Sequence, residues 1–206
     1  MEGYGEAKEL ILASASQRRR ALLENCGYLF TVMPSRAEEE GVRADSPGEL
    51  VERLSLLKAE AVFRSLPAER KRGAVVLGSD TVVTLDGNII GKPRSGEEAF
   101  RMLREESGRA NTVYTGLALV ALGPDGGPSA RVLHDSAEVR FSVLTDDEIA
   151  AYVNTGDPMD KAGAYGIQGR FSVHIESVSG SYFTVVGLPV HLVYRELKRY
   201  GILPRA

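Results

Sequence analysis

The pattern of hydrophobic and polar positions alternates between strand-like and helix-like stretches along the first half of the chain. Short apolar runs at residues 10–13 and 74–78 predict buried strands. Between them, apolar residues at helical spacing predict a helix over residues 46–66. The apolar face of that helix is expected to hold Leu50, Leu54, Leu57 and Ala61.

Three helix starts share one signal, a hydroxyl residue followed three positions later by glutamate. The signal occurs at Ser46, Ser95 and Thr145, and Pro47 at the first helical position strengthens the first of them. These capping boxes predict helices over residues 46–66, 95–108 and 145–156.

The remaining pattern predicts strands interleaved with hairpins. Asp86-Gly87 lies between two β-rich runs and predicts a two-residue turn. The strands on either side of the glycine-rich residues 123–128 are expected to pair antiparallel. Because such hairpins interrupt the βαβ units, the chain is expected to be α/β with a mixed sheet. The other expected elements are helices at 17–25 and 190–200 and strands at 28–33, 81–85, 88–90, 112–122, 131–144, 173–178 and 183–186.

Composition narrows the class of protein. The 206 residues are 43% hydrophobic and 26% charged, which is typical of a globular protein, and the net charge of −3 argues against a nucleic-acid-coating surface. A single cysteine, Cys26, excludes a disulfide framework and indicates a reducing compartment. No apolar run is long enough for a membrane span, and the acidic residues 1–6 lack a signal-peptide core. We therefore expect a cytoplasmic enzyme or binding protein.

The segment from Ser14 to Arg20 is the first candidate for chemistry. It follows the strand at residues 10–13 and opens a helix, whose first backbone N–H groups lack partners within the helix and attract anions. Arg18 and Arg19 add guanidinium groups that grip phosphate oxygens. The alternative is that Ser16 only caps the helix and the arginines are solvated.

Three further segments carry unusual polar groups. Ser79-Asp80-Thr81 is expected at a break after the apolar strand, where a carboxylate can bind a metal or act as a base, or else only form a turn. Lys92 lies between glycine and proline, and is either aimed at a ligand or simply solvated. Residues 160–169 are glycine-rich, which suits a loop that approaches a ligand with its backbone.

Other catalytic templates are absent from the sequence. It has no P-loop, no zinc-protease helix motif, no G-x-S-x-G elbow and no cysteine or histidine cluster. Its histidines, His134, His174 and His191, are scattered and are expected to be partly buried packing residues.

Taken together, these stretches resemble the Maf family of nucleoside triphosphate pyrophosphatases. The chain departs from the family pattern at Gln17, where proline is usual, and at Asn111, where histidine is common. The stretches that carry the resemblance occur in the family's order and are residues 14–19, 78–83, 91–93, 113–116, 160–169 and 186–189.

The resemblance implies a fold and an assembly. The fold would be α/β, with a mixed, strongly twisted sheet flanked by helices as in inosine triphosphatase, and residues 1–206 would form one domain with two lobes around a central cleft. It also implies a homodimer. From the cysteine usage, the net charge and the lack of a long apolar run, we expect this protein to be cytoplasmic, to form no stable nucleic-acid complex and not to associate with membranes.

The resemblance also assigns roles to individual residues. Asp80 would be the proton acceptor, and with Glu39 would hold a divalent cation, Mg²⁺ or Mn²⁺. Glu39 fits the family's acidic position, nineteen residues before Lys58, although Glu38 and Glu40 remain alternatives. The expected phosphate-binding residues are Ser14, Arg19, Lys58 and Lys92, with Glu39 and Lys92 also catalytic. The expected base-specificity residues are Arg18, Thr81 and Gln168.

The implied reaction is hydrolysis of dTTP and UTP to the nucleoside monophosphate and pyrophosphate, by metal-assisted attack of water on the α-phosphorus. The purpose would be nucleotide-pool sanitation, with a link to cell division. Two alternatives stay open at this point. One is a non-catalytic nucleotide- or phosphate-binding regulator of septum formation, and the other is the same reaction on a modified nucleotide such as 7-methyl-GTP.

Overall fold

The computed structural model describes residues 8–205, so the expectation for residues 1–6 lies outside the described residues. The chain divides into two compact units. The first consists of Met1–Asp80, Thr115–Asp135 and Gly187–Ala206, and the second of Thr81–Tyr114 and Ser136–Val186.

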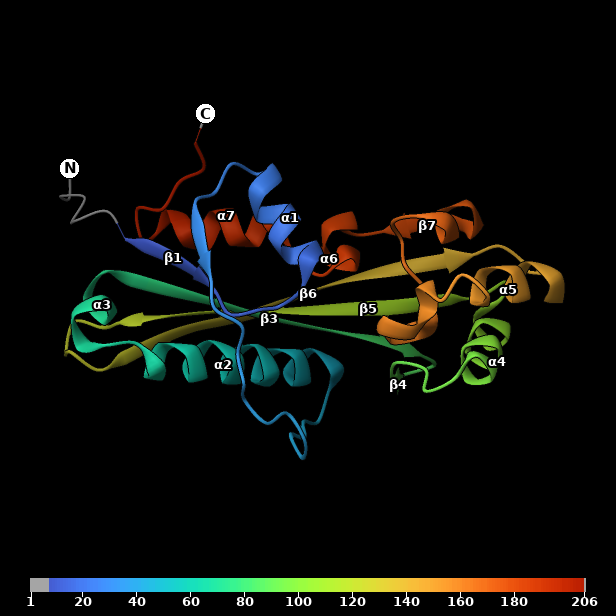
Figure 1. Ribbon diagram of the computed structural model, residues 1–206, viewed down its shortest axis with the longest axis horizontal. Coiled ribbons are helices and arrows are strands. Elements are labelled where there is room, and N and C mark those ends of the chain that lie inside the picture. Colours follow the sequence, from blue (N-terminus) through green and yellow to red (C-terminus); the bar gives the residue numbers. More distant parts are fainter. Residues whose placement is uncertain (1–7, 206) are drawn as a thin grey trace. The chain divides into compact units, whose positions relative to one another are not determined.

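A seven-stranded sheet with the order β2-β1-β3-β5-β6-β7, in which β4 also pairs with β3, is the framework of the fold (Figure 1). β1 pairs in parallel with β2 and β3, whereas β4 runs antiparallel to β3 and β7 antiparallel to β6, so the predicted mixed α/β fold is confirmed. The strands are β1 Glu9–Leu12, β2 Phe30–Val32, β3 Ala74–Leu85, β4 Asn88–Ile90, β5 Ala110–Leu122, β6 Pro128–Phe141 and β7 Ile175–Ser179. The helices are α1 Gln17–Asn25, α2 Pro47–Ser65, α3 Ala68–Gly73, α4 Gly96–Glu106, α5 Asp146–Val153, α6 Tyr182–Val186 and α7 Val190–Lys198.

In the first unit, helices cover both faces of the strands, with α2 on one side and α1 and α7 on the other (Figure 1). Close approach of α2 depends on two glycines. A Cβ on Gly78 would lie 2.2 Å from the Ser55 carbonyl oxygen, and one on Gly116 would lie 2.2 Å from that of Val51. The buried face of α2 differs from the predicted one. Of the four residues predicted to lie on it, only Leu54 is buried.

β3 corrects one expectation, because it continues from Ala74 to Leu85 without the predicted break at Ser79-Asp80-Thr81. Ser79 is fully buried, and its hydroxyl donates to the Gly116 carbonyl oxygen at 2.8 Å. A satisfied hydroxyl can be buried at little cost, so the strand does not have to end there.

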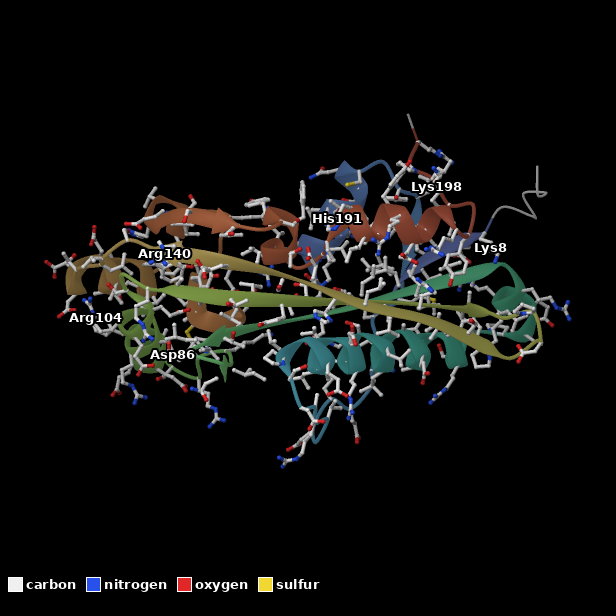
Figure 2. The ribbon with its side chains drawn as sticks, turned by 180° about the vertical axis from the view of Figure 1, so that it is seen from behind. Lys8, Asp86, Arg104, Arg140, His191 and Lys198 are labelled. Atoms are coloured by element: carbon white, nitrogen blue, oxygen red, sulfur yellow. The ribbon has the colours of Figure 1, made fainter. Side chains whose placement is uncertain are left out.

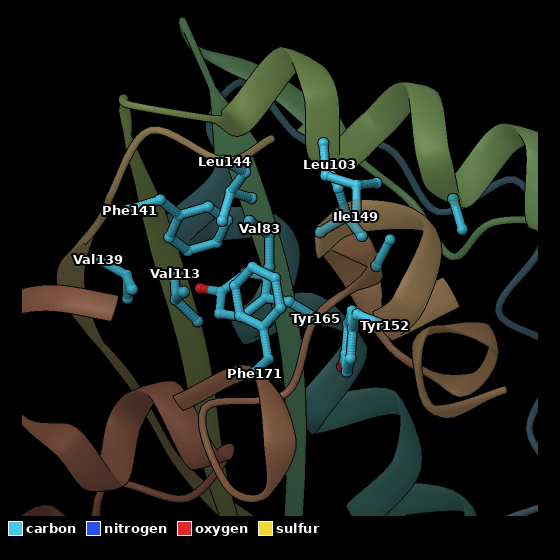
Figure 3. Close-up of a cluster of buried hydrophobic side chains, with 12 residues drawn as sticks. Val83, Leu103, Val113, Val139, Phe141, Leu144, Ile149, Tyr152, Tyr165 and Phe171 are labelled. Atoms are coloured by element: carbon cyan, nitrogen blue, oxygen red, sulfur yellow. The ribbon is translucent and has the colours of Figure 1, made fainter. Parts of the chain in front are cut away.

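In the second unit, a cluster of aromatic and aliphatic side chains forms the core (Figure 3). Phe171 is its centre, with ring centroids 4.8 Å from Tyr152, 4.9 Å from Phe141 and 5.5 Å from Tyr165. The predicted Asp86-Gly87 turn is confirmed, since β3 and β4 pair with Leu85 opposite Asn88 and both turn residues have positive φ.

The predicted helix starts are confirmed, but only one is a complete capping box. The hydroxyls of Ser46, Ser95 and Thr145 each accept from the backbone N–H three residues on. Only at Thr145 does the glutamate bond back to the N-cap backbone, because Glu49 and Glu98 instead accept from the residue before the cap. The strand expected at residues 183–186 is wrong, since these residues belong to α6.

Candidate active site

Arg19 is turned inward at the start of α1, in the first unit. Ser16 caps the helix by accepting from the Arg19 backbone N–H, and the Arg19 guanidinium donates to the Ser14 hydroxyl at 3.2 Å and to the Gly187 carbonyl oxygen at 2.8 Å. Arg20 points elsewhere and pairs with Glu24 at 2.8 Å on the exposed side. The serine cap is confirmed, and the expectation that the arginines are solvated is wrong for Arg19; binding of phosphate by this segment stays a prediction.

Lys58, Asp80 and Glu39 meet in the same unit. The Lys58 Nζ lies 2.6 Å from Asp80 Oδ1 and 2.9 Å from Glu39 Oε2. The side chains of Lys58 and Asp80 are 13% and 15% exposed, and that of Glu39 is 48% exposed. The structure thus brings together a lysine and two acids that the sequence separates by up to 41 residues, from 39 to 80.

The strand geometry explains how Asp80 reaches Lys58. Residues two apart on a strand share a face, so Asp80 lies on the same face of β3 as Gly78. Gly78 is where α2 packs against the strand through Ser55, and Lys58 is nearly one turn further along that helix. The close helix–strand contact at Gly78 therefore positions the ammonium over the carboxylate.

The charges around Arg19 are linked to this group. Burial is the largest effect on the Arg19 guanidinium and lowers its pKa, Arg18 adds to the lowering, and Asp80 and Glu39 oppose it. Two arginines and two acids thus influence one another in one region of the first unit, which suits a ligand with both phosphate oxygens and a bound cation.

The remaining predicted residues, Thr81, Lys92 and Gln168, belong to the second unit. The backbone N–H of Gly163 donates to the Gly91 carbonyl oxygen at 3.1 Å, which ties the turn carrying Lys92 to the loop carrying Gln168. Lys92 and Gln168 are both exposed, and Thr81 is half-buried on β3.

No group of three or more histidine, cysteine or carboxylate side chains that could hold a metal ion occurs among residues 8–205. Asp80 and Glu39 instead offer two carboxylates around one cationic position, which Lys58 Nζ marks. Mg²⁺ is commonly bound by one or two carboxylates together with substrate phosphates, so these two residues fit a cation that arrives with a polyphosphate.

Sequence reasoning missed a buried polar chain in the second unit. The Tyr165 hydroxyl donates to Asn111 Oδ1 at 3.1 Å, and Asn111 Nδ2 donates to Glu106 Oε1 at 2.9 Å. Burial raises the pKa of Glu106 from 4.5 to about 8. The one sequence feature that could have indicated this hydrogen-bond chain was Asn111, where the family commonly has histidine. An amide can donate to one neighbour while it accepts from another, so it can link two buried polar groups.

The histidines have different surroundings. His134 lies 2.8 Å from Glu52 through Nδ1, and the His174 ring lies 5.3 Å from that of Phe171. His191 is exposed on α7, with Lys198 further along the same helix (Figure 2), and His134 is exposed as well, so the expectation of partial burial is confirmed only for His174. None of the helices described in residues 8–205 is both long and apolar enough to cross a bilayer.

Known proteins similar to this chain were found by sequence and by structure. The model of the family described as "Maf-like protein" matches residues 9–200. A dTTP/UTP pyrophosphatase of Symbiobacterium thermophilum is 49% identical over 194 residues, 94% of this chain and 95% of that protein. A dTTP/UTP pyrophosphatase of Moorella thermoacetica is 48% identical over 196 residues, 94% of this chain and 96% of that protein. The solved Ham1 protein of Staphylococcus aureus is 19% identical, with a TM-score of 0.44 and coverage of 65% of this chain and 72% of that one.

Proposed function

The chain belongs to the Maf family, and on that premise we propose that it hydrolyses dTTP and UTP to the nucleoside monophosphate and pyrophosphate. One observation carries the proposal. Lys58 Nζ contacts the carboxylates of both Asp80 and Glu39, in the unit where Arg19 is held inward beside Ser14. A site built only to bind an anion gains nothing from two carboxylates beside it, whereas hydrolysis uses them.

Asp80 is the proton acceptor in this mechanism. Its carboxylate is held by Lys58 at 2.6 Å, so its direction is fixed before substrate binds. It orients a water toward the α-phosphorus and accepts the proton as the bond to the leaving pyrophosphate breaks. Phosphoryl chemistry of this kind depends on positioning and charge stabilisation more than on a covalent intermediate.

Lys58, Arg19 and Lys92 offset the negative charge on the pyrophosphate as it leaves. The Ser14 hydroxyl, which orients Arg19, also contacts the phosphates. Asp80 and Glu39 would hold a divalent cation, Mg²⁺ or Mn²⁺, which when bound would supply positive charge toward the phosphates and activate water. Arg18, Thr81 and Gln168 recognise the base, and the amide of Gln168 suits uracil and thymine because it both donates and accepts hydrogen bonds.

A pyrophosphate-release assay with UTP, dTTP, CTP and 7-methyl-GTP tests the proposal, with Mg²⁺ or Mn²⁺ added in separate series. Turnover of UTP and dTTP above the other two supports it. Preference for 7-methyl-GTP would show that the substrate is a modified nucleotide rather than dTTP or UTP. Nucleotide binding without pyrophosphate release would favour a non-catalytic regulator of septum formation.

Lys92 provides a separate test of the phosphate-binding set. Lys92→Ala is expected to lower kcat/KM for UTP at least ~10-fold, because a positioned cation on the leaving group is lost. The melting temperature should barely change, since the side chain is exposed. Equal loss of activity and stability would instead indicate a structural lysine.

We also propose that the protein acts as a homodimer in the cytoplasm, where removal of unwanted nucleotides protects the pool and affects cell division. The family membership and the single cysteine support this. Sedimentation of the purified protein tests the dimer, and fractionation of the source cells tests the compartment.

A further inference from the structure

The loop that carries Gln168 is not fixed by regular secondary structure. It consists of short 3₁₀ turns at Asp157–Asp160, Ala162–Ala164 and Arg170–His174. Gly163 and Gly169 have φ of +74° and +96°, and Ala164 has a positive φ that is unusual for a residue with a side chain. The position of Gln168 therefore depends on contacts that hold this backbone.

Three side chains supply such contacts. Lys161 Nζ donates to the Asp157 carbonyl oxygen at 2.6 Å and to Asp157 Oδ1 at 2.9 Å, and it also bonds Asp160 Oδ1 at 2.7 Å. The Tyr152 hydroxyl donates to Asp157 Oδ2 at 2.5 Å. Tyr152, Asp157 and Lys161 thus form one connected cluster.

This cluster reaches the backbone two residues before Gln168. The Gly166 N–H donates to the Tyr152 hydroxyl at 3.2 Å. Gly166 also packs against the stem of Lys161, because a Cβ at this position would lie 2.7 Å from Lys161 Cε. The approach to Gln168 is therefore held from two sides by the same cluster.

The Tyr152 ring anchors the cluster in the core, and the cluster's environment shifts the pKa values of Tyr152 and Asp157. Tyr152 is 4% exposed and its ring lies 4.8 Å from that of Phe171 (Figure 3). Burial, followed by the nearby Asp157 carboxylate, raises the pKa of Tyr152, so the phenol stays a donor. Burial opposes ionisation of Asp157, but the hydrogen bonds from Tyr152 and Lys161 outweigh it and lower its pKa.

We propose that Tyr152, Asp157 and Lys161 are positioning residues that set base selectivity by fixing the backbone beside Gln168. The inference rests on the proposed function, in which Gln168 recognises the base. Recognition by an amide requires placement to within about 0.5 Å, and side chains locked by packing and hydrogen bonds supply that accuracy. None of the three is proposed to contact the nucleotide, so each acts only through the backbone that it holds.

Tyr152→Phe tests the inference, because it keeps the ring in the core and removes only the hydroxyl. We expect the ratio of kcat/KM for UTP to that for CTP to fall about 10-fold, since a displaced amide no longer discriminates between bases. The KM for UTP should rise more than kcat falls, because the phosphate-binding and proton-accepting residues are untouched. Asp157→Asn should change the ratio in the same direction.

Thr145→Ala is the matched control for simple loss of stability. It removes the cap of α5, the helix that carries Tyr152, without touching the cluster. Its UTP-to-CTP ratio should equal that of the wild-type protein. A fall as large as that of Tyr152→Phe would overturn the inference, because destabilisation alone would then account for the effect.

Gln168→Ala separates this inference from the function on which it rests. If the cluster acts through Gln168, Tyr152→Phe should cause no further fall in the ratio when Gln168 is already alanine. If Gln168→Ala lowers the ratio and Tyr152→Phe does not, the inference alone is wrong. If Gln168→Ala leaves the ratio unchanged, the base-reading role is wrong and the inference fails with it. Absence of any pyrophosphate release by the wild-type chain would refute the proposed function itself.

Discussion

Asp80 in the first unit and Glu106 in the second present the same carboxyl group to opposite surroundings. Asp80 is partly exposed and has the Lys58 ammonium at 2.6 Å. Glu106 is 1% exposed, its Oε1 accepts from the neutral amide of Asn111 at 2.9 Å, and its buried Oε2 has no hydrogen-bond partner among residues 8–205. A neighbouring cation favours the charged form of a carboxyl group, which can bind a metal or accept a proton. Burial without a cation favours the neutral form, which can remain in the protein interior as a hydrogen-bonded group.

The matched amide substitutions test this contrast most strongly. Asp80→Asn should lower kcat at least ~10²-fold, the scale of losing a catalytic base, while Glu106→Gln should leave turnover close to that of the wild type. Pyrophosphate release under saturating UTP measures both. Wild-type turnover in Asp80→Asn would remove Asp80 from the mechanism.

Replacing Lys58 makes the surroundings of Asp80 more like those of Glu106. Lys58→Met removes the ammonium but keeps much of the stem, so Asp80 and Glu39 lose the cation that contacts them both. We expect kcat/KM to fall at least ~10-fold, because charge stabilisation of the phosphates is lost and the carboxylate is no longer oriented. Steady-state kinetics across a range of Mg²⁺ concentrations measure the effect. Unchanged kinetics would mean that the pair with Asp80 is only structural.

The same contrast shows what could be predicted from sequence. Asp80 was a candidate because it follows an apolar strand, Lys58 and Glu39 were assigned only through the family resemblance, and the alternation of patterns predicted the mixed sheet. The contact of Lys58 with both acids could not be read from a pattern, because it depends on α2 packing against Gly78. The predicted break at Ser79 failed because a buried partner, the Gly116 carbonyl oxygen, satisfies its hydroxyl 37 residues away in sequence.

Glu106 was overlooked for a similar reason. On a helical pattern, a glutamate in the last turn of α4 reads as an exposed residue, and only the tertiary fold buries it. The strand expected at residues 183–186 failed because β-branched and aromatic residues have only weak preferences, which tertiary contacts override in α6.

Glu106 should make stability depend on pH in a defined window. The folded chain keeps this proton up to about pH 8, whereas the unfolded chain releases it near pH 4.5. Between these values the unfolded state binds fewer protons, so this group lowers the free energy of unfolding as pH rises, by up to about 1.4 kcal/mol per pH unit. Glu106→Gln cannot ionise and should lack this contribution. Urea unfolding at a series of pH values compares the two, and parallel curves would show that Glu106 is ionised when folded.

The smallest expected effect concerns Tyr165, which lies at the opposite end from Glu106 of the buried hydrogen-bond chain through Asn111. Tyr165→Phe removes the hydroxyl that donates to Asn111 Oδ1 at 3.1 Å but keeps the ring among Phe141 and Phe171. The change should cost about 1 kcal/mol of unfolding free energy, the net value of one buried hydrogen bond. In the Glu106→Gln background the cost should differ, because residues in one hydrogen-bonded network are coupled. Urea midpoints of the two single variants and the double variant measure this coupling, and strict additivity would mean that Asn111 does not link Tyr165 to Glu106 energetically.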